Sequence, residues 1–265
     1  MESTPAIPRS QNVLITGASS GIGRELARIF ARDGFSLILI ARSQPALEQL
    51  ARELKERYNS DSRIIIKDLE QPQAASEIFA ELQEVGAAVD ILVNNAGYGA
   101  SGPFSESDLD KDLGLLQVNI LALTALTRLF LPEMLKRNQG KILNLGSTAG
   151  FQPGPFMATY YASKAYVISF SEALAVELKE TGVTVTTLCP GPTVTEFATR
   201  ANMRSSLMKS AFTIQNARTV AEIGYKGLMQ GKGVVVPGAI NRVGAYAVKF
   251  LPRRIAATIV KQVQK

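Results

Sequence analysis

Three side chains that could move a proton or stabilise a charge lie in the middle of the chain. Tyr160 comes thirteen residues after Ser147, and Lys164 comes four residues after Tyr160. Residues four apart share one face of a helix, so we expect Tyr160 and Lys164 to be neighbours. Because the chain has no histidine, a phenol is the candidate for proton transfer near neutral pH.

A phenol has an ordinary pKa of about 10, which is too high for a base at pH 7. A nearby ammonium group favours the phenolate and lowers that pKa, and we expect Lys164 to do this for Tyr160. The Ser147 hydroxyl can donate a hydrogen bond to a substrate oxygen and stabilise the charge that develops there. These residues therefore suit hydride transfer to or from a carbonyl carbon, with the tyrosine supplying or taking the proton.

A glycine-rich stretch near the N-terminus, TGASSGIG (16–23), lies between an apolar run and an amphipathic segment. Its glycines have the spacing G-x3-G-x-G rather than the G-x-G-x-x-G of the common dinucleotide fingerprint. Gly17 permits a tight turn, and Gly21 and Gly23 let the backbone approach a pyrophosphate at a helix N-terminus. We expect Ser19, Ser20 and Ile22 to line the same nucleotide site.

The ends of the following strands add candidate contacts to a nucleotide. Arg42 stands where an acidic residue would favour NAD, and its guanidinium can bind a 2′-phosphate through two parallel hydrogen bonds. The sequence therefore predicts NADP(H) as the cofactor. We expect Asp68 and Leu69 to lie at the adenine edge. Further expected contacts are Asn95, Ala96 and Gly97 in the stretch NNAG, although its asparagines would equally serve to hold neighbouring strands together.

Seven short β-branched runs alternate with amphipathic segments. The runs are 12–16, 36–41, 63–68, 90–96, 141–147, 183–189 and 233–238, and the amphipathic segments are 21–33, 44–58, 72–85, 107–137 and 155–180. Apolar runs without alternation are typical of strands in a parallel sheet that is covered on both faces. The pattern predicts an α/β fold in one domain: a Rossmann-like, doubly wound parallel sheet of about seven strands with helices on both faces. Such a sheet binds its ligand beyond the carboxyl ends of the strands.

The composition excludes several other kinds of chemistry. With no histidine and only one cysteine, Cys189, the chain lacks the usual zinc ligands and any Ser-His-Asp or Cys-His nucleophile, and we expect no metal site. The first eleven residues lack the apolar core of a signal peptide. The sequence contains no uncharged apolar stretch of about 18 residues, so no membrane span is predicted. We therefore expect a cytoplasmic protein.

Six motifs, in order, make residues 10–240 resemble the short-chain dehydrogenase/reductase family. The motifs are TGASSGIG, NNAG, Asn119 in QVNI, Ser147, YYASK and PGPTVTEF. The resemblance implies a catalytic tetrad of Asn119, Ser147, Tyr160 and Lys164, in which Lys164 also binds the cofactor ribose. It implies that Asn119 lies at a helix kink and holds a proton-relaying water, although from the residues alone Asn119 could be a polar side chain satisfied within a helix. Tyr160 rather than Tyr161 fits both spacings, so Tyr161 is assigned to packing.

The same resemblance places the PGPTVTEF turn beside the nicotinamide. The implied cofactor contacts there are Pro190, Gly191, Thr193 and Thr195; the pair Pro192-Thr193 departs from a bulkier apolar pair, which leaves the Thr193 contact open. The resemblance also divides the chain into a flexible segment (1–11), a catalytic domain (12–240) with a substrate flap at about 195–216, and a basic amphipathic extension (241–265).

The activity implied by the resemblance is that of an NADP(H)-dependent carbonyl reductase or alcohol dehydrogenase. Apolar residues in and before the flap favour a lipophilic ketone or aldehyde, although they would equally pack the flap onto the body of the protein. The rival interpretation is a non-catalytic NADP(H)-sensing protein on the same fold. In the family the long fourth and fifth helices commonly pair subunits, and both carry apolar stripes here, so we expect a homodimer or homotetramer.

The net charge of +6 is concentrated at the C-terminus, where residues 226–265 contain eight Lys or Arg and no Asp or Glu. The amphipathic extension could rest on an anionic membrane, cover the substrate cleft or form a subunit contact, and a solvated basic face is the simplest interpretation. We expect no nucleic-acid partner, because the basic segment lacks interleaved aromatic residues and any known reading motif.

Overall fold

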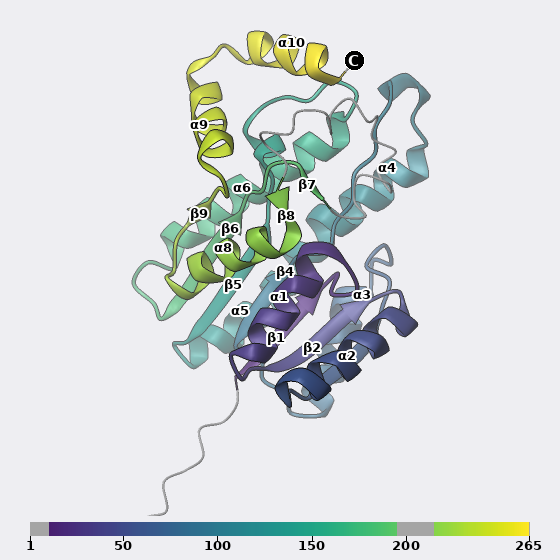
Figure 1. Cartoon of the computed structure of the whole chain (residues 1–265), viewed down its shortest axis with the longest axis vertical. Helices are drawn as coiled ribbons and strands as arrows, with labels where there is room; N and C mark the ends of the chain where they lie inside the picture. The colour runs from purple at the N-terminus through teal and green to yellow at the C-terminus, as the bar shows by residue number, and fades with distance from the viewer. Residues whose placement is uncertain (1–10, 195–214, 265) are drawn as a thin grey trace, which may run out of the picture.

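The centre of the molecule is a parallel sheet (Figure 1). The computed structural model describes residues 11–194 and 215–264. The strand order is β3-β2-β1-β4-β5-β6-β9, and every pairing within this sheet is parallel. Val13, Leu14 and Ile15 of the central strand are completely buried. Successive side chains of a strand point to opposite faces, so an unbroken apolar run implies that both faces are covered.

The strands lie where the apolar runs predict them. They are β1 (Asn12–Thr16), β2 (Ser36–Ala41), β3 (Ser62–Ile66), β4 (Ile91–Asn94), β5 (Gly140–Leu145), β6 (Val183–Leu188) and β9 (Val234–Val235). The α-helices of the described residues are α1 (Gly21–Arg32), α2 (Gln44–Tyr58), α3 (Ala74–Glu84), α4 (Leu109–Leu116), α5 (Leu123–Lys136), α6 (Ala158–Glu177), α8 (Ala217–Met229), α9 (Ala239–Ala247) and α10 (Arg253–Gln264). The predicted α/β fold, with its doubly wound parallel sheet, is confirmed.

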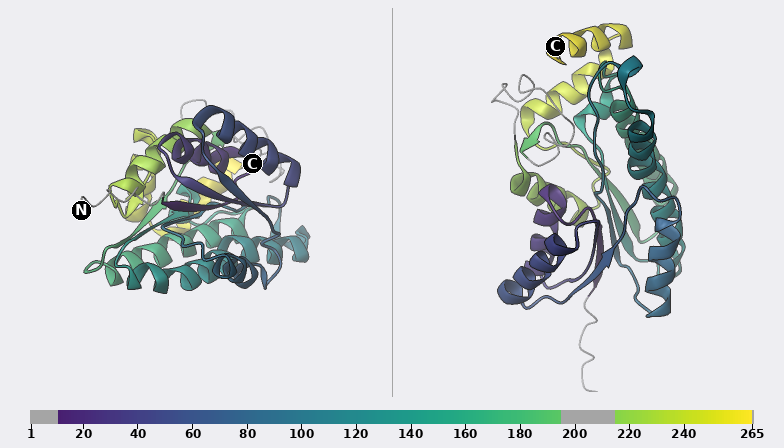
Figure 2. Two further views of the ribbon diagram at one scale, coloured as in Figure 1. Left: turned by 90° about the horizontal axis from the view of Figure 1, so that it is seen from below. Right: turned by 90° about the vertical axis from the view of Figure 1, so that its right-hand side faces the viewer.

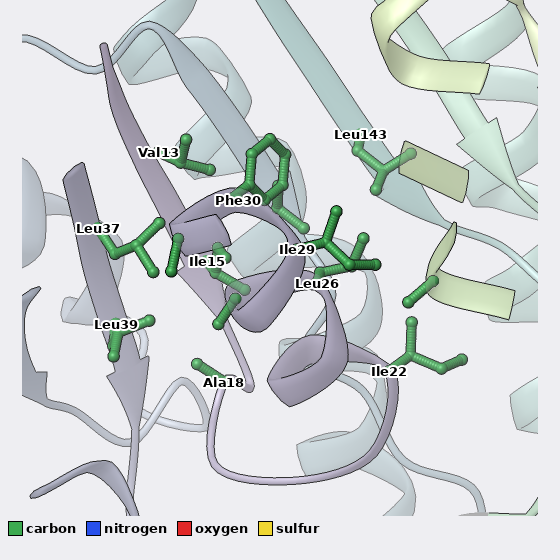
Figure 3. Packing of buried hydrophobic residues seen from close by; sticks show 14 of the residues in the cluster. Val13, Ile15, Ala18, Ile22, Leu26, Ile29, Phe30, Leu37, Leu39 and Leu143 are labelled. Carbon is green, nitrogen blue, oxygen red and sulfur yellow. The ribbon is translucent and has the colours of Figure 1, made fainter. Parts of the chain in front are cut away.

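Helices form one layer on each face of the sheet (Figure 2). Helices α1, α2 and α8 cover one face, and α3, α5 and α6 cover the other. On the first face Phe30 of α1 is completely buried and packs against the strands (Figure 3). Its ring lies 5.0 Å from that of Tyr225 in an edge-to-face arrangement, which joins α1 to α8. The apolar stripes of the helices are therefore the faces that hold the layers together.

The strand order reverses direction at β1. The chain runs outward from β1 through β2 to β3 and then returns to place β4 on the other side of β1. At such a switch point the loops after β1 and β4 diverge and leave a crevice at the carboxyl edge of the sheet. The glycine-rich turn, Arg42, the NNAG stretch and Ser147 all follow the carboxyl ends of strands, so the fold brings them to this edge.

The long fourth helix is interrupted by a π-helical turn, Gln117–Ala122, between α4 and α5. Asn119 lies in this turn, at the predicted kink. Among the described residues, the helix Leu109–Lys136 is long and apolar enough to cross a membrane, and 44% of its most apolar window is buried inside the protein. Because α5 packs on α3 and on the sheet, its apolar character is that of a core helix.

Two short strands were not predicted. Short strands β7 (Thr193–Val194) and β8 (Gln215–Asn216) pair in parallel at the two ends of a segment that is not described. The C-terminal extension consists of α9, a 3₁₀ turn (Val248–Phe250) and α10, and it lies apart from the two main layers in Figure 1. Most of the predicted flexible segment 1–11, most of the predicted flap 195–216, and Thr195 lie outside the described residues, and the predicted domain limits stay predictions.

Candidate active site

The turn between β1 and α1 presents bare backbone to a cavity. Gly17 and Gly21 have φ angles of +66° and +54°, in the left-handed region that glycine adopts without strain. A Cβ atom on Gly17 would lie 2.9 Å from both Cα of Ala96 and the side-chain nitrogen of Asn95. The Ser20 side chain makes no capping hydrogen bond to α1. The first N–H groups of that helix are therefore available to an anionic group.

The two asparagines after β4 have different roles. The Asn94 side chain donates to Oδ1 of Asn144 at 2.9 Å and so joins β4 to β5. The Asn95 side chain donates to the backbone carbonyls of Thr16 at 2.9 Å and Gly17 at 3.2 Å, which fixes the glycine-rich turn. Asn95 also lines the cavity. Of the two roles left open by the sequence, Asn94 therefore has the structural one, and Asn95 combines it with a position in the site.

Arg42 lies at the end of β2, at the rim of the same cavity. Its side chain is 58% exposed, and one terminal nitrogen lies 3.2 Å from Glu70 and 3.8 Å from Asp68. These exposed ion pairs are weak, so the guanidinium can turn toward a stronger anion such as a phosphate. The neighbours Ser43 and Lys67 also line this end of the cavity.

The reactive end of the cavity contains Ser147, Tyr160 and Lys164. Ser147 caps a 3₁₀ turn after β5, and its hydroxyl is hydrogen-bonded to the buried Tyr160 phenol. Lys164 lies one helical turn further along α6 and donates to the carbonyl oxygen of Leu145 at 2.8 Å. Its ammonium nitrogen is 5.8 Å from the centre of the Tyr160 ring. The structure therefore brings these three predicted residues together.

Asn119 lies behind this group, 1% exposed, and does not line the cavity. Its side chain accepts a hydrogen bond from the backbone N–H of Tyr98 and donates to Tyr98 O and to Ser163 Oγ, at 3.0–3.1 Å. A Cβ atom on Gly97 would lie 2.9 Å from Asn119 Oδ1 and 3.3 Å from Lys164 Nζ, so the glycine allows both side chains to approach. Asn119 is thus placed to position the loop beside Lys164.

Burial dominates the protonation of the reactive group. It raises the pKa of Tyr160 to about 12, against an opposing effect of the hydrogen bond from Ser147. It lowers the pKa of Lys164 to about 8, because an ammonium group in an apolar environment loses its hydration. The expectation that Lys164 lowers the phenol pKa is therefore wrong for the protein's own groups: desolvation outweighs the charge of a lysine that is itself buried.

One cavity of about 890 Å³ connects the glycine-rich turn to the reactive group. This volume is sufficient for a ligand of drug size or larger. The predicted residues that line it are Gly17, Ser19, Ser20, Gly21, Ile22, Arg42, Asp68, Leu69, Asn95, Ala96, Gly97, Ser147, Tyr160, Lys164, Pro190, Gly191 and Thr193. Gly23 does not line it; a Cβ atom there would collide with the Asn95 side chain and the Gly17 carbonyl, so Gly23 permits close packing of α1.

Several lining residues near the reactive group were not predicted as site residues, among them Gln152, Tyr161 and Gln264. Tyr161 does pack against Tyr160, as expected, but it also faces the cavity. Gln264 lies 103 residues further along the chain and donates a 2.9 Å hydrogen bond to the Tyr161 hydroxyl. No motif in the sequence marks this glutamine. Among the described residues, no cluster of three acidic or thiol side chains could hold a metal.

Comparison with known proteins identifies the family. Residues 11–205 match the family model described as short chain dehydrogenase, so the chain belongs to that family. It is 35% identical over 233 residues to very-long-chain 3-oxoacyl-CoA reductase from Anas platyrhynchos, covering 85% of this chain and 72% of that protein. It is 41% identical over 190 residues to sulfoacetaldehyde reductase 2 from Chromohalobacter salexigens, covering 71% and 75%. The match to dehydrogenase/reductase SDR family member 7B from Rattus norvegicus spans only 58% of the length of that relative.

A solved structure extends this likeness to nearly the whole fold. The short-chain dehydrogenase from Sphingobium yanoikuyae in complex with NADPH superimposes with a TM-score of 0.81 at 31% identity, covering 90% of this chain and 92% of that one. The chain is therefore an oxidoreductase of the short-chain dehydrogenase class, as its motifs predict.

Proposed function

We propose that the protein is an NADP(H)-dependent oxidoreductase that transfers a hydride between nicotinamide and a carbonyl or secondary alcohol. The observation that carries the proposal is the buried Tyr160 phenol, which is hydrogen-bonded to Ser147 and lies beside the Lys164 ammonium. This group lies in the same cavity as the glycine-rich turn, so a nucleotide bound at the turn would extend toward it.

The residues present fit NADP(H). The turn at Gly17 and Gly21 lines the cavity, and the uncapped first N–H groups of α1 beside it can bind a pyrophosphate. Arg42 is exposed at the opposite end, and among the described residues its ion pairs are with the partly exposed Asp68 and Glu70, so it is available for a 2′-phosphate. The Sphingobium yanoikuyae relative in complex with NADPH supports this assignment. When bound, the cofactor supplies or accepts the hydride.

In reduction, Ser147 donates a hydrogen bond to the carbonyl oxygen, and Tyr160 gives that oxygen its proton as negative charge develops on it. The raised pKa of Tyr160 keeps the phenol protonated at neutral pH, which suits a proton donor. Lys164, with a pKa of about 8, is mainly cationic at pH 7 and stabilises the phenolate that remains. The protonated phenol is the form that reduction requires, whereas oxidation requires the phenolate.

The proposed substrate is a lipophilic ketone or aldehyde. The part of the cavity beyond Ser147 is lined by apolar and aromatic groups, among them Ala149, Met157 and Tyr161. The 3-oxoacyl-CoA reductase among the relatives supports a long acyl ketone as substrate. The sulfoacetaldehyde reductase, by its name, acts on a small polar carbonyl, so membership of the family does not by itself define the substrate.

The experiment is NADPH and NADH consumption with small aldehydes, β-keto acyl esters, sterol ketones and sulfoacetaldehyde. We expect turnover with NADPH that is highest for the acyl or sterol ketones. Turnover that is highest for sulfoacetaldehyde would contradict the lipophilic substrate. Tight NADPH binding without turnover of any carbonyl would favour the rival function, a non-catalytic NADP(H)-sensing protein.

We also propose a homodimer or homotetramer in solution. Leu109, Leu113 and Leu121 on the long helix are 53–68% exposed, and Val176 on α6 is 75% exposed. An exposed apolar set on adjacent helices is typical of a subunit interface. Light scattering tests the proposal: a particle of two or four times 28.5 kDa is expected. A monomer at micromolar concentration would contradict it.

We propose that the C-terminal extension touches an anionic membrane from the cytoplasm. A single buried cysteine, Cys189, is in keeping with a reducing compartment. The extension exposes large apolar side chains, with Phe250 at 89% and Val243 at 67% exposed, and residues 226–265 contain eight basic and no acidic residues. Apolar side chains interleaved with lysine and arginine suit the headgroup region of anionic lipids.

Co-sedimentation with vesicles tests the membrane contact. The intact protein should bind vesicles that contain phosphatidylserine and not those of phosphatidylcholine alone, and salt should weaken the binding. Phe250→Ser should reduce binding, whereas Phe104→Ser, which changes another exposed phenylalanine outside the extension (70% exposed), should not. If the intact protein does not sediment with either vesicle, the contact does not exist.

A further inference from the structure

The last helix returns the chain to the active site. Ala256, Val260 and Gln264 follow one another at intervals of four along α10 and are all buried, with 4–9% exposure. Residues at this spacing share one face of a helix. That face therefore rests on the protein, and Gln264 at its end reaches the lining of the cavity.

Gln264 is fixed to a tyrosine beside the reactive group. Its amide nitrogen donates to the Tyr161 hydroxyl at 2.9 Å. The Tyr161 ring is held from one side by Gly154, where a Cβ atom would overlap the ring. The Tyr161 ring also meets the Tyr160 ring edge to face, with the ring centres 6.1 Å apart. Tyr161 thus connects α10 with the proton-donating phenol.

The Tyr161–Gln264 pair has hydrogen-bonding capacity that the described protein does not use. Because the Tyr161 oxygen accepts the amide proton, its own O–H is left to donate elsewhere. Gln264 is nine-tenths buried, and within 11–194 and 215–264 its Oε1 has no hydrogen-bond donor. A buried acceptor without a donor is unfavourable, so rotation of the Gln264 amide toward a donor in the cavity would be favourable. A ligand that offers such a donor would then bind more tightly than one that does not.

We propose that Tyr161 and Gln264 form a subsite for a hydrogen-bond donor, an amide N–H or a hydroxyl, close to the substrate's reactive carbonyl. The proposal rests on the proposed carbonyl chemistry and makes Gln264 a specificity residue rather than a catalytic one. Because the Tyr161 and Tyr160 rings are in contact, the donor belongs within a few bonds of the carbonyl carbon. A β-keto amide has such an N–H, and the matching β-keto ester lacks it.

The test compares these two compounds, with identical alkyl chains, as substrates with NADPH. Wild type should favour the amide in kcat/KM by at least about tenfold, mainly through KM. Gln264→Leu should reduce that ratio to within about twofold, because it lowers kcat/KM for the amide far more than for the ester. The matched control is Gln262→Leu, the same substitution at an exposed position of α10, which should keep the ratio. An unchanged ratio in Gln264→Leu, or an equal loss of kcat/KM with both substrates, would overturn the subsite. The Gln264 side chain would then serve only to hold α10 in place.

Binding separates this inference from the proposed function. Calorimetry of the amide and the ester with NADP⁺-loaded Tyr160→Phe protein needs no turnover. Tighter binding of the amide, lost in Gln264→Leu, would support the subsite even if wild type reduced neither compound, an outcome that would count against the proposed function alone. Equal affinity for the two, or binding of neither, would overturn the subsite even if wild type were an active reductase.

Discussion

The ammonium nitrogen of Lys164 lies 5.8 Å from the centre of the Tyr160 ring and is anchored to the Leu145 carbonyl at 2.8 Å. The tyrosine and the lysine come from α6, whereas the anchor belongs to β5. The separation of phenol and cation is therefore fixed by the packing of a helix on the sheet and does not depend on the rotamer of a free lysine.

Replacing this lysine should impair chemistry more than folding. In Lys164→Met the phenolate that forms on proton transfer loses its cation, and we expect kcat to fall by about 100-fold or more. The thermal midpoint should not fall, because the variant no longer buries an ammonium group. Steady-state kinetics and thermal unfolding of the same preparation check both statements. A variant with lost activity and a lowered midpoint would mean that the lysine mainly supports the fold.

The stability of the protein should rise with pH in a window set by Lys164. The pKa of this lysine is lowered from 10.5 to about 8, so between these values the folded state binds fewer protons than the unfolded state. Stability from this group is therefore gained as pH rises through 8 and is complete above 10.5. Cys189 and Tyr160, whose pKa values are raised by burial, oppose this gain above about pH 9 and about pH 10.

Urea unfolding of wild type and Lys164→Met at pH 7.5 and 9.5 measures the effect. We expect the difference in the free energy of unfolding, wild type minus variant, to be about 1 to 2 kcal/mol larger at pH 9.5 than at pH 7.5. A difference that is independent of pH would show that Lys164 is solvated in the folded protein.

The glycine at the start of the nucleotide turn should be needed for cofactor binding. Gly17→Ala adds a Cβ atom 2.9 Å from Ala96 at a φ of +66°, which should weaken NADPH binding by about tenfold or more. Gly34→Ala is the matched control, because Gly34 also has a positive φ, +86°, but no neighbour within 4 Å. Gly34→Ala should lose about 1 kcal/mol of stability through its positive φ, Gly17→Ala should lose more because of its close neighbours, and only Gly17→Ala should lose affinity. Equal NADPH affinity in the two variants would place the pyrophosphate elsewhere.

Arg42 should set the preference for NADPH over NADH. Arg42→Ala removes a charge-assisted partner of the 2′-phosphate, so the dissociation constant of NADPH should rise about ten- to a hundredfold while that of NADH changes little. Arg52→Ala, at an exposed position of α2, serves as the control. Fluorescence titration with both cofactors checks this, and an unchanged preference would remove Arg42 from the site.

Most of the fold and of the nucleotide site could be predicted because the signals are local. An apolar run marks each buried strand, and the residues that follow it are brought to one edge by the parallel topology alone. Every predicted contact of the glycine-rich turn except Gly23 lines the cavity. Gly23 serves packing, which depends on how closely α1 approaches Asn95 and could not be read from spacing.

The rest depends on contacts between distant parts of the chain. Gln264 reaches Tyr161 across 103 residues, and nothing in the local sequence of α10 distinguishes it from Gln262. The pKa of Tyr160 was predicted in the wrong direction, because spacing gives the neighbour of the phenol but not the amount of water excluded from both groups. Asn119 is at the predicted kink, but its partners are a backbone segment and a serine that only the folded chain brings close.

The most direct test of the central claim is the turnover of NADPH by Tyr160→Phe, measured with the best carbonyl substrate together with the NADPH dissociation constant. Tyr166→Phe, the same substitution at a half-exposed position of α6, is the control. We predict that kcat falls by about a thousandfold or more in Tyr160→Phe alone, with NADPH affinity unchanged within about threefold in both variants. Turnover near the wild-type rate in Tyr160→Phe would contradict the account, since no other phenol of the described chain is bonded to Ser147 beside Lys164.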